Sequence, residues 1–215
     1  MRDPWGLNER MFGFYYPILM GLSERAGHSE TRRELLADAR GRTCEIGAGS
    51  GYNLPHYTDA VSELIVTEPS PHMRRHLRGK LAASPPPVGA WELTEAGAEN
   101  LPFPDESFDT VVGTYVHCTV PSPVRALAEI HRVLRPGGRY LFIEHVRGAD
   151  GSLIGAVQDA LEVPHRYFAA GCYPNRRTER ILRDSPLTVE RLEHSTLPLG
   201  LLTVRPIIIG SASRD

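Results

Sequence analysis

Three glycines with alternating spacing are the first feature of this sequence that could bind a ligand. Gly47, Gly49 and Gly51 follow a short apolar run at 43–46 and precede a helical pattern. Glycine at such a place lets the backbone turn sharply and lets a ligand approach without meeting a Cβ atom. The dinucleotide-binding fingerprint needs glycine or alanine at position 52, where this chain has Tyr52, and this mismatch argues against NAD or FAD. A tight turn alone would also explain the glycines.

An acidic residue supports the interpretation of this turn as a binding site. Glu68 ends the next predicted strand, at 63–67, and lies 17 residues after Gly51. A carboxylate at that place can accept hydrogen bonds from both ribose hydroxyls of an adenosine. A solvated glutamate at a strand end is the alternative. Because ligands of open α/β sheets bind at the carboxyl ends of the strands, the two features together predict an adenosine-type cofactor.

Two histidines follow later strands and could act as bases near neutral pH. His117 comes after the predicted strand at 110–114, and His145 comes after the one at 139–144. Both lie at the carboxyl edge of the sheet, where acid–base groups would meet a bound acceptor. We expect His145 to be catalytic. For His117, a catalytic role and a loop histidine bonded to the backbone are equally compatible with the sequence.

Short apolar runs alternate with helical patterns, which is typical of parallel strands joined by crossover helices. Helices are expected near 8–26, 29–39, 53–58, 71–82, 123–134, 151–162 and 177–183. Strands are expected at 43–46, 63–67, 91–94, 110–114, 139–144, 188–194 and 204–211. No helical pattern separates the last two strands, which predicts an antiparallel pair. The fold class is therefore α/β, with a Rossmann-like, mostly parallel sheet, a C-terminal antiparallel strand pair and helices on both faces.

Composition limits the possible functions. The 215 residues fit one domain, and a net charge of -2 supplies no basic field for nucleic acid. The three cysteines, Cys44, Cys118 and Cys172, are too widely spaced to indicate a disulfide framework or a metal site. The sequence shows no secretory leader, and its apolar stretch at 11–22 is shorter than the ~20 residues that span a bilayer. We expect a cytoplasmic monomer or homodimer with no transmembrane segment.

Four motifs, in order along the chain, carry a resemblance to a known family. The segments at 45–51, 98–103, 107–109 and 132–138 are similar to class I methyltransferases related to the ubiquinone/menaquinone C-methyltransferases. Shorter motifs at 142–146, 171–172 and 201–207 resemble the methyltransferase-like thiol S-methyltransferase branch. The resemblance implies the class I methyltransferase fold, S-adenosylmethionine (SAM) as the methyl donor and a small-molecule acceptor.

The resemblance also implies which residues contact the cofactor. Glu45 and the glycine turn would line the methionine end of SAM, and Glu68 would hold the ribose. Ala98, through its backbone, and Glu99, through its side chain, would meet the adenine. Tyr16 would close the site from the leading helix. The full set is Glu45, Gly47, Ala48, Gly49, Gly51, Glu68, Pro69, Ala98, Glu99, Thr114, Tyr115 and Tyr16.

Residues 1–40 are expected to form a helical lid of the single domain, and residues 147–183 are expected to form an insertion on the acceptor side.

The sequence leaves three functions open. Methyl transfer needs no enzyme nucleophile, so Cys118 is expected to be a small buried residue. The acceptor could be a thiol, which reacts as its thiolate, or a phenol- or quinone-like metabolite methylated on oxygen or carbon. A non-catalytic SAM-binding protein is the third alternative, because Gly97 stands where many relatives carry aspartate.

Overall fold

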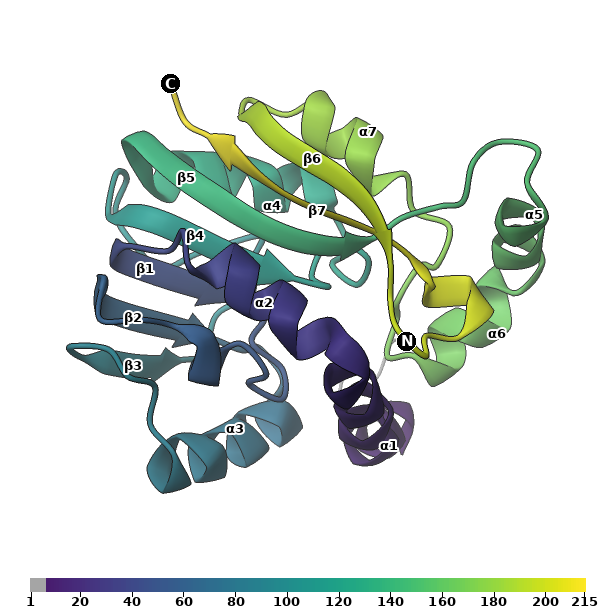
Figure 1. Cartoon of the computed structure of the whole chain (residues 1–215), viewed down its shortest axis with the longest axis horizontal. Helices are drawn as coiled ribbons and strands as arrows, with labels where there is room; N and C mark the ends of the chain where they lie inside the picture. Colours follow the sequence, from purple (N-terminus) through teal and green to yellow (C-terminus); the bar gives the residue numbers. More distant parts are fainter. Residues whose placement is uncertain (1–6) are drawn as a thin grey trace.

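The computed structural model describes the backbone of residues 7–215 and the side chains of residues 13–215, and a seven-stranded sheet lies at its centre (Figure 1). The strand order is β3-β2-β1-β4-β5-β7-β6. The strands are β1 (Gly41–Ile46), β2 (Val61–Thr67), β3 (Trp91–Thr94), β4 (Phe108–Thr114), β5 (Leu134–His145), β6 (Thr188–Thr196) and β7 (Pro206–Ser213). Strands β1 to β5 pair in parallel, and β7 runs antiparallel to both β5 and β6. The predicted fold class is confirmed.

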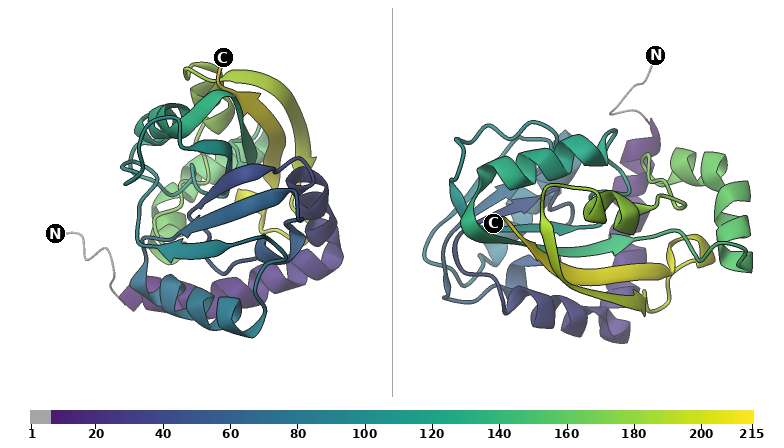
Figure 2. Two further views of the ribbon diagram at one scale, coloured as in Figure 1. Left: turned by 90° about the vertical axis from the view of Figure 1, so that its left-hand side faces the viewer. Right: turned by 90° about the horizontal axis from the view of Figure 1, so that it is seen from above.

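Helices cover both faces of the sheet. They are α1 (Leu7–Ser23), η1 (Glu24–His28), α2 (Ser29–Leu36), η2 (Leu54–His56), α3 (Pro71–Ala83), α4 (Pro123–Val133), α5 (Leu153–Ala160), α6 (Glu162–Phe168), α7 (Thr178–Arg183) and η3 (Leu202–Val204). The two further views show α2 and α4 on opposite faces (Figure 2). In the part of the chain that the structure describes, no helix is long and apolar enough to cross a membrane.

Strand β5 contributes side chains to the apolar clusters on both faces of the sheet. Tyr140 and Phe142 pack in the apolar cluster beneath α4, and Leu141 and Ile143 pack in the cluster that includes residues of α2 and α3. Successive side chains of a strand point to opposite faces, and a central parallel strand is apolar on both. This alternation sends Glu144 and His145 to different faces where β5 ends.

Two predicted helices differ from the structure, and the separate helix α6 (Glu162–Phe168) was not predicted. The helix expected at 53–58 is only the 3-10 turn η2, after which Tyr57 is extended, with ψ of 155°. The leading helix, expected to run to residue 26, leaves regular α-geometry after Ser23, and Gly27 adopts a φ of 115°. This conformation is accessible to glycine and produces a kink between α1 and α2. Residues 1–6 of the predicted lid lie outside the described residues.

Candidate active site

The glycine turn lies at the carboxyl end of β1. Gly47, Gly49 and Gly51 have φ angles of 58°, 55° and 66°, in the left-handed region that favours glycine. A Cβ atom on Gly51 would come within 2.6 Å of a Leu77 methyl group, so a side chain has no room there. The turn is tied to the next strand, because the Ala48 N–H donates to the carbonyl of Thr67 at 2.9 Å.

Glu68 meets the glycine turn as the sequence predicted. Its carboxylate is 6% exposed and accepts the N–H of Gly49 and the N–H of Ser70, each at 2.8 Å. Pro69 leads into α3, and Arg74 of that helix donates to the Pro69 carbonyl at 2.7 Å. Two loops therefore hold the Glu68 carboxylate in place beside the turn.

Glu45 lies beneath the glycine turn rather than along its open side. It is 1% exposed, and its two oxygens accept from Asn53 Nδ2 at 3.0 Å and from the Tyr57 hydroxyl at 2.8 Å. Burial raises the pKa of Glu45 to about 7. The structure does not support the expected contact with the methionine end of the cofactor. Glu45 instead holds Asn53 and Tyr57, the residues on either side of the 3-10 turn η2, toward the interior.

Arg32 was not anticipated from the sequence. Its guanidinium is 3% exposed and donates to Glu24 at 2.8 Å, to Asn53 Oδ1 at 2.7 Å and to Thr114 Oγ1 at 3.1 Å. These bonds connect the helices that precede β1 with the glycine turn and with the end of β4. Arg33 is 63% exposed, so only the tertiary structure distinguishes these two neighbouring arginines.

Tyr115 lies between two imidazoles at the end of β4. Its hydroxyl is 2.7 Å from His28 Nε2, and its ring centroid is 4.4 Å from that of His145. His28 is fully buried, and this burial, with the nearby Arg32 charge, lowers its pKa to about 3. Tyr115 itself has a φ of 61°. The predicted residues Thr114, Tyr115 and His145 therefore share one region with the unpredicted residues His28 and Arg32.

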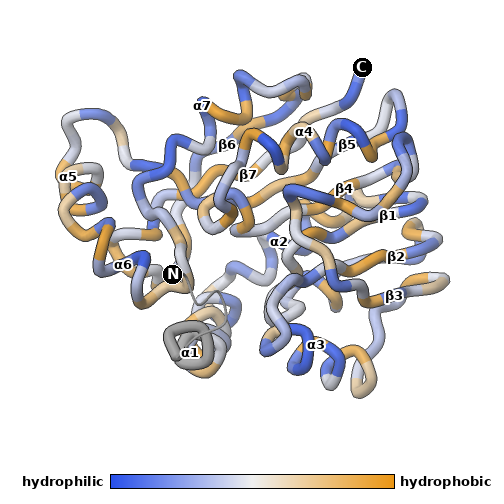
Figure 3. The backbone as a smooth tube through the Cα atoms, turned by 180° about the vertical axis from the view of Figure 1, so that it is seen from behind, coloured by the Kyte–Doolittle hydropathy of each residue, from blue (hydrophilic) through white to orange (hydrophobic). Residues whose placement is uncertain are grey.

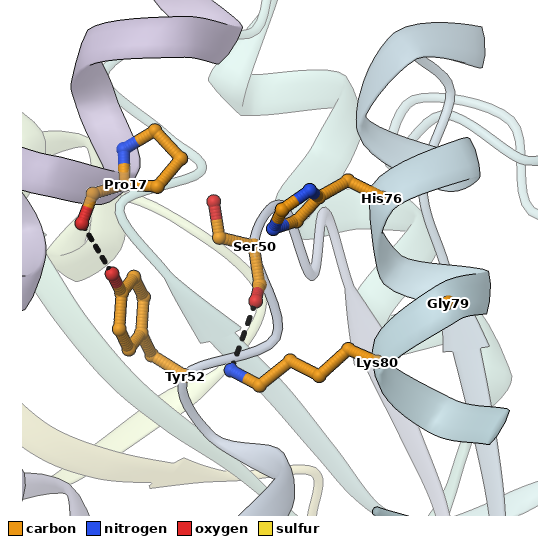
Figure 4. Close-up of a pocket in the computed structure, with 6 residues that line it drawn as sticks. All are labelled: Pro17, Ser50, Tyr52, His76, Gly79 and Lys80. Atoms are coloured by element: carbon orange, nitrogen blue, oxygen red, sulfur yellow. Dashed lines mark hydrogen bonds between the residues drawn. The ribbon is translucent and has the colours of Figure 1, made fainter. Parts of the chain in front are cut away.

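The leading helix braces the glycine turn from outside. The Tyr52 hydroxyl donates to the carbonyl of Pro17 at 2.6 Å, and Lys80 Nζ donates to the carbonyl of Ser50 at 3.1 Å (Figure 4). A pocket of about 430 Å³ lies between α1, the turn and α3. It is lined by Pro17, Ser50, Tyr52, His76, Gly79 and Lys80.

Burial raises the pKa of the Tyr16 phenol in α1. Charge interactions of this phenol with Arg32, Tyr52 and Cys118 indicate that Tyr16 lies near the glycine turn and the loop after β4. The role of Tyr16 in closing the cofactor site stays a prediction.

His117 lies on the other face of the sheet. It is 1% exposed, its Nε2 is 2.8 Å from the Tyr140 hydroxyl, and its backbone N–H donates to Glu144 at 3.0 Å. Tyr140 belongs to the cluster beneath α4. The structure therefore does not support the predicted role of His117 as a base, and it favours the alternative of a buried structural histidine.

The burial of the His117 imidazole should make the free energy of unfolding depend on pH. Burial, with the nearby Arg176 charge, lowers the pKa of His117 from 6.5 to about 3. As the pH falls below 6.5 the unfolded chain binds a proton before the folded chain does, so stability present above pH 6.5 is progressively lost. We expect the stability advantage of the wild type over His117→Gln to shrink by about 1.4 kcal/mol per pH unit between about pH 6 and pH 4.5. Urea unfolding at several pH values measures this difference, and a pH-independent difference would contradict it.

Glu99 is also placed differently from the expectation. Its carboxylate accepts the N–H of Ser122 at 2.8 Å and is 3.1 Å from the guanidinium of Arg125, so it is bound at the start of α4. Ala98, which is 5% exposed, precedes it in the loop after β3. A contact between the Glu99 side chain and adenine is therefore not supported, whereas the backbone of Ala98 remains a candidate for that contact.

Two cysteines adjoin His145. Cys118, His145 and Cys172 each place one potential ligand atom within 4.8 Å of the others. Cys118 is buried as expected, but it is not isolated, because the thiol of Cys172 and burial together raise its pKa. The sequence offered no signal for this cluster, since each member is 27 residues from the next along the chain.

Comparison with known proteins identifies the family. Residues 44–142 match the family described as a methyltransferase domain. The chain is 31% identical over 210 residues to the thiol S-methyltransferase TMT1B of Homo sapiens, in an alignment that covers 92% of this chain and 85% of the human protein. The chain belongs to the class I SAM-dependent methyltransferases.

Other relatives of this methyltransferase differ in their acceptors. A phosphatidylethanolamine N-methyltransferase of Cereibacter sphaeroides is 34% identical over 165 residues, which cover 76% of this chain and 77% of that protein. The solved structure of a SAM-dependent methyltransferase from Thermotoga maritima, described as a possible histamine N-methyltransferase, has a TM-score of 0.67 at 23% identity. It covers 96% of this chain and 99% of that chain, and it shows the same fold. The methyltransferase is thus an enzyme with SAM as its cofactor.

The residues at the strand ends fit SAM. The hydroxyls of Ser50 and Thr67 are buried beside the glycine turn, and neither has a hydrogen-bond partner among the described residues. A bound polar ligand would satisfy such groups, which otherwise cost free energy. The Glu68 carboxylate and the glycine backbone lie next to them. When bound, SAM supplies a methyl group on a sulfonium centre.

Proposed function

We propose that this methyltransferase transfers the methyl group of SAM to the sulfur of a small apolar thiol. The alignment of nearly the whole chain with a human thiol S-methyltransferase is the observation that carries the proposal. It includes the segments on the acceptor side, outside the matched methyltransferase domain at 44–142.

Two buried imidazoles near the strand ends are poorly suited to take a proton from a phenol. His28 has a pKa of about 3 and so has little tendency to accept a proton. His117, one of the two predicted bases, lies on the opposite face of the sheet. A thiol, with a reference pKa of about 8.5, ionises more readily at neutral pH than a phenol, with one of about 10. An acceptor that forms its own anion suits this site better.

The acceptor-side insertion provides an apolar surface. A hollow of about 400 Å³ lies between α5, α6 and η3. Figure 3 shows apolar stretches of α5 and α6 at the end of the molecule opposite β3. The apolar residues that line this hollow are Val157, Leu161, Pro164, Phe168, Leu201 and Leu202. The Tyr15 hydroxyl of α1 donates to the Phe168 carbonyl, so the leading helix contacts α6 beside this hollow. An alkyl or aryl substituent on the thiol would suit this lining.

The chain's own residues then have distinct tasks. Glu68 would hold the ribose, and the backbone of Ala98 would meet the adenine. Thr114 and Tyr115 would support the methionine part, whose carboxylate the Arg32 charge would attract. Tyr16 would help to exclude water. Alignment of acceptor and methyl group can by itself lower the barrier, by up to ~7–11 kcal/mol in the best cases.

A panel of acceptors tests the proposal. The release of S-adenosylhomocysteine from SAM is measured with alkyl thiols, aryl thiols, phenols and quinols at equal concentration. We expect release with apolar thiols and none above background with phenols or quinols. Turnover of phenols or quinols without turnover of thiols would overturn the thiol acceptor and favour O- or C-methylation.

A further inference from the structure

Three side chains that prefer soft metal ions converge beside the active site. Cys118 follows β4, His145 ends β5 and Cys172 follows α6, and their ligand atoms all lie within 4.8 Å of one another. Cys172 Sγ is 3.9 Å from His145 Nδ1. Around a tetrahedral zinc ion, with Zn–S and Zn–N bonds of about 2.3 and 2.0 Å, such atoms are separated by about 3.5–3.8 Å. Small side-chain movements would close the cluster around an ion.

The cluster is buried, and its side chains make only weak hydrogen bonds with one another. Cys118, His145 and Cys172 are 1%, 7% and 6% exposed. The Cys118 thiol donates to the Tyr115 carbonyl at 3.4 Å, and His145 Nδ1 lies 3.9 Å from the Cys172 sulfur. Thiols are weak hydrogen-bonding groups, so they compensate little for the burial of an imidazole. A cation bound by the two sulfurs and by Nδ1 would replace these weak contacts.

Hydrogen bonds to backbone carbonyls position the three ligand residues. The N–H of Tyr173 donates to the carbonyl of Cys118 at 2.8 Å, which fixes the two cysteine-bearing turns side by side. The Thr178 hydroxyl donates to the carbonyl of His145 at 3.2 Å. Ligands that are positioned before binding lose less conformational entropy when an ion arrives.

We propose that Cys118, His145 and Cys172 bind one zinc ion. Two thiolates and one imidazole are ligands that zinc prefers, and a set of three leaves the fourth position open, as in catalytic zinc sites. The cluster adjoins the strand ends where SAM fits, because the His145 ring packs against the Tyr115 ring at 4.4 Å. The next residue, Val116, lies 3.1 Å from where a Cβ atom on Gly47 would stand.

The open position gives the ion a role, and this step rests on the proposed thiol function. The sulfur of the acceptor thiol binds zinc and its proton leaves to solvent, because a coordinating thiol is deprotonated. The lone pair of that sulfur forms the new S–C bond to the methyl group while the sulfonium S–C bond breaks. The products are a neutral thioether and S-adenosylhomocysteine, and the proton is the third product.

Metal titration of the full-length chain tests the site without relying on activity. Reduced protein, freed of metal with a chelator, is titrated with zinc against a chromophoric competitor and separately with cobalt(II). We expect one ion per chain, with the thiolate-to-metal charge-transfer absorption and intense visible bands of tetrahedral cobalt. Cys118→Ser and Cys172→Ser should each weaken zinc binding at least about 100-fold. Cys44→Ala, which removes the third cysteine from the interior of β1, should leave binding unchanged.

The outcomes separate the site from the proposed function. Absence of stoichiometric zinc and of the cobalt spectrum in a wild type that still binds S-adenosylhomocysteine would overturn the site. Equal binding by wild type and both serine variants would also overturn it, because the ion would then lie on surface histidines. Zinc bound as expected, with no thiol methylated, would retain the site and reject the thiol function. Full thiol turnover after complete removal of zinc would retain the function and reject the zinc role.

Discussion

Replacing Arg32 by methionine should lower the free energy of unfolding by about 3–5 kcal/mol, because it removes one partner of a buried ion pair. The Glu24 carboxylate, only 9% exposed, would lose its cation at 2.8 Å. Asn53 Oδ1 and Thr114 Oγ1 would lose a donor at the same time. Since Asn53 follows the glycine turn and Thr114 ends β4, SAM binding should be lost together with stability. Urea unfolding followed by circular dichroism measures the first effect, and calorimetric titration with SAM measures the second.

The neighbouring arginine is the matched control for this substitution. Arg33 is 63% exposed and pairs with Glu30, itself 53% exposed, on the surface of the same helix. Exposed pairs contribute little, so Arg33→Met should change stability by less than about 1 kcal/mol. If Arg32→Met lowered the free energy of unfolding no more than Arg33→Met does, the buried network would not stabilise the protein as we infer.

Replacing Glu68 by glutamine should weaken SAM binding at least about tenfold while the protein remains folded. A hydrogen bond to a charged group contributes about 1.5–3 kcal/mol, and the amide retains only one of the two acceptor atoms offered to the ribose. The carboxylate already lies beside the glycine turn, 2.8 Å from the N–H of Gly49. Calorimetric titration with SAM and with S-adenosylhomocysteine gives the affinity of each protein.

Glu193→Gln provides the same chemical change outside the site. Glu193 of β6 is 67% exposed and lies 4.0 Å from Arg191, so its substitution should leave SAM affinity unchanged within about twofold. Unfolding curves of both variants show whether the loop around Glu68 has been disturbed as well. Unchanged affinity in Glu68→Gln would remove this residue from the cofactor site.

Local signals in the sequence were sufficient to predict that the glycine turn and Glu68 lie side by side. The glycine turn and Glu68 follow consecutive parallel strands, whose carboxyl ends meet at one edge of a sheet. Backbone conformations that favour glycine are also recorded directly in the residue type, as at Gly51. The prediction that these two features come together is therefore supported by the Glu68–Gly49 hydrogen bond.

The residue-by-residue predictions were less successful where side-chain direction decided the role. Glu45 and Glu99 lie in the expected segments, yet one points beneath the glycine turn and the other to the start of α4. His117 follows β4 and His145 ends β5, but they lie on opposite faces of the sheet. A resemblance of motifs predicts where a residue lies along the chain, but it does not predict the direction in which its side chain points.

The sequence by itself determined the α/β class, the antiparallel C-terminal pair, the family and the position of the glycine turn, because these depend on periodicity, glycine conformation and short motifs. Only the tertiary structure selected Arg32 over Arg33 as the buried arginine and brought Cys118, His145 and Cys172 together. The physical reason is that such groups are joined by long-range packing of separate elements. Cys118, His145 and Cys172 are each 27 residues from the next along the chain, and this spacing does not predict that their ligand atoms lie within 5 Å of one another.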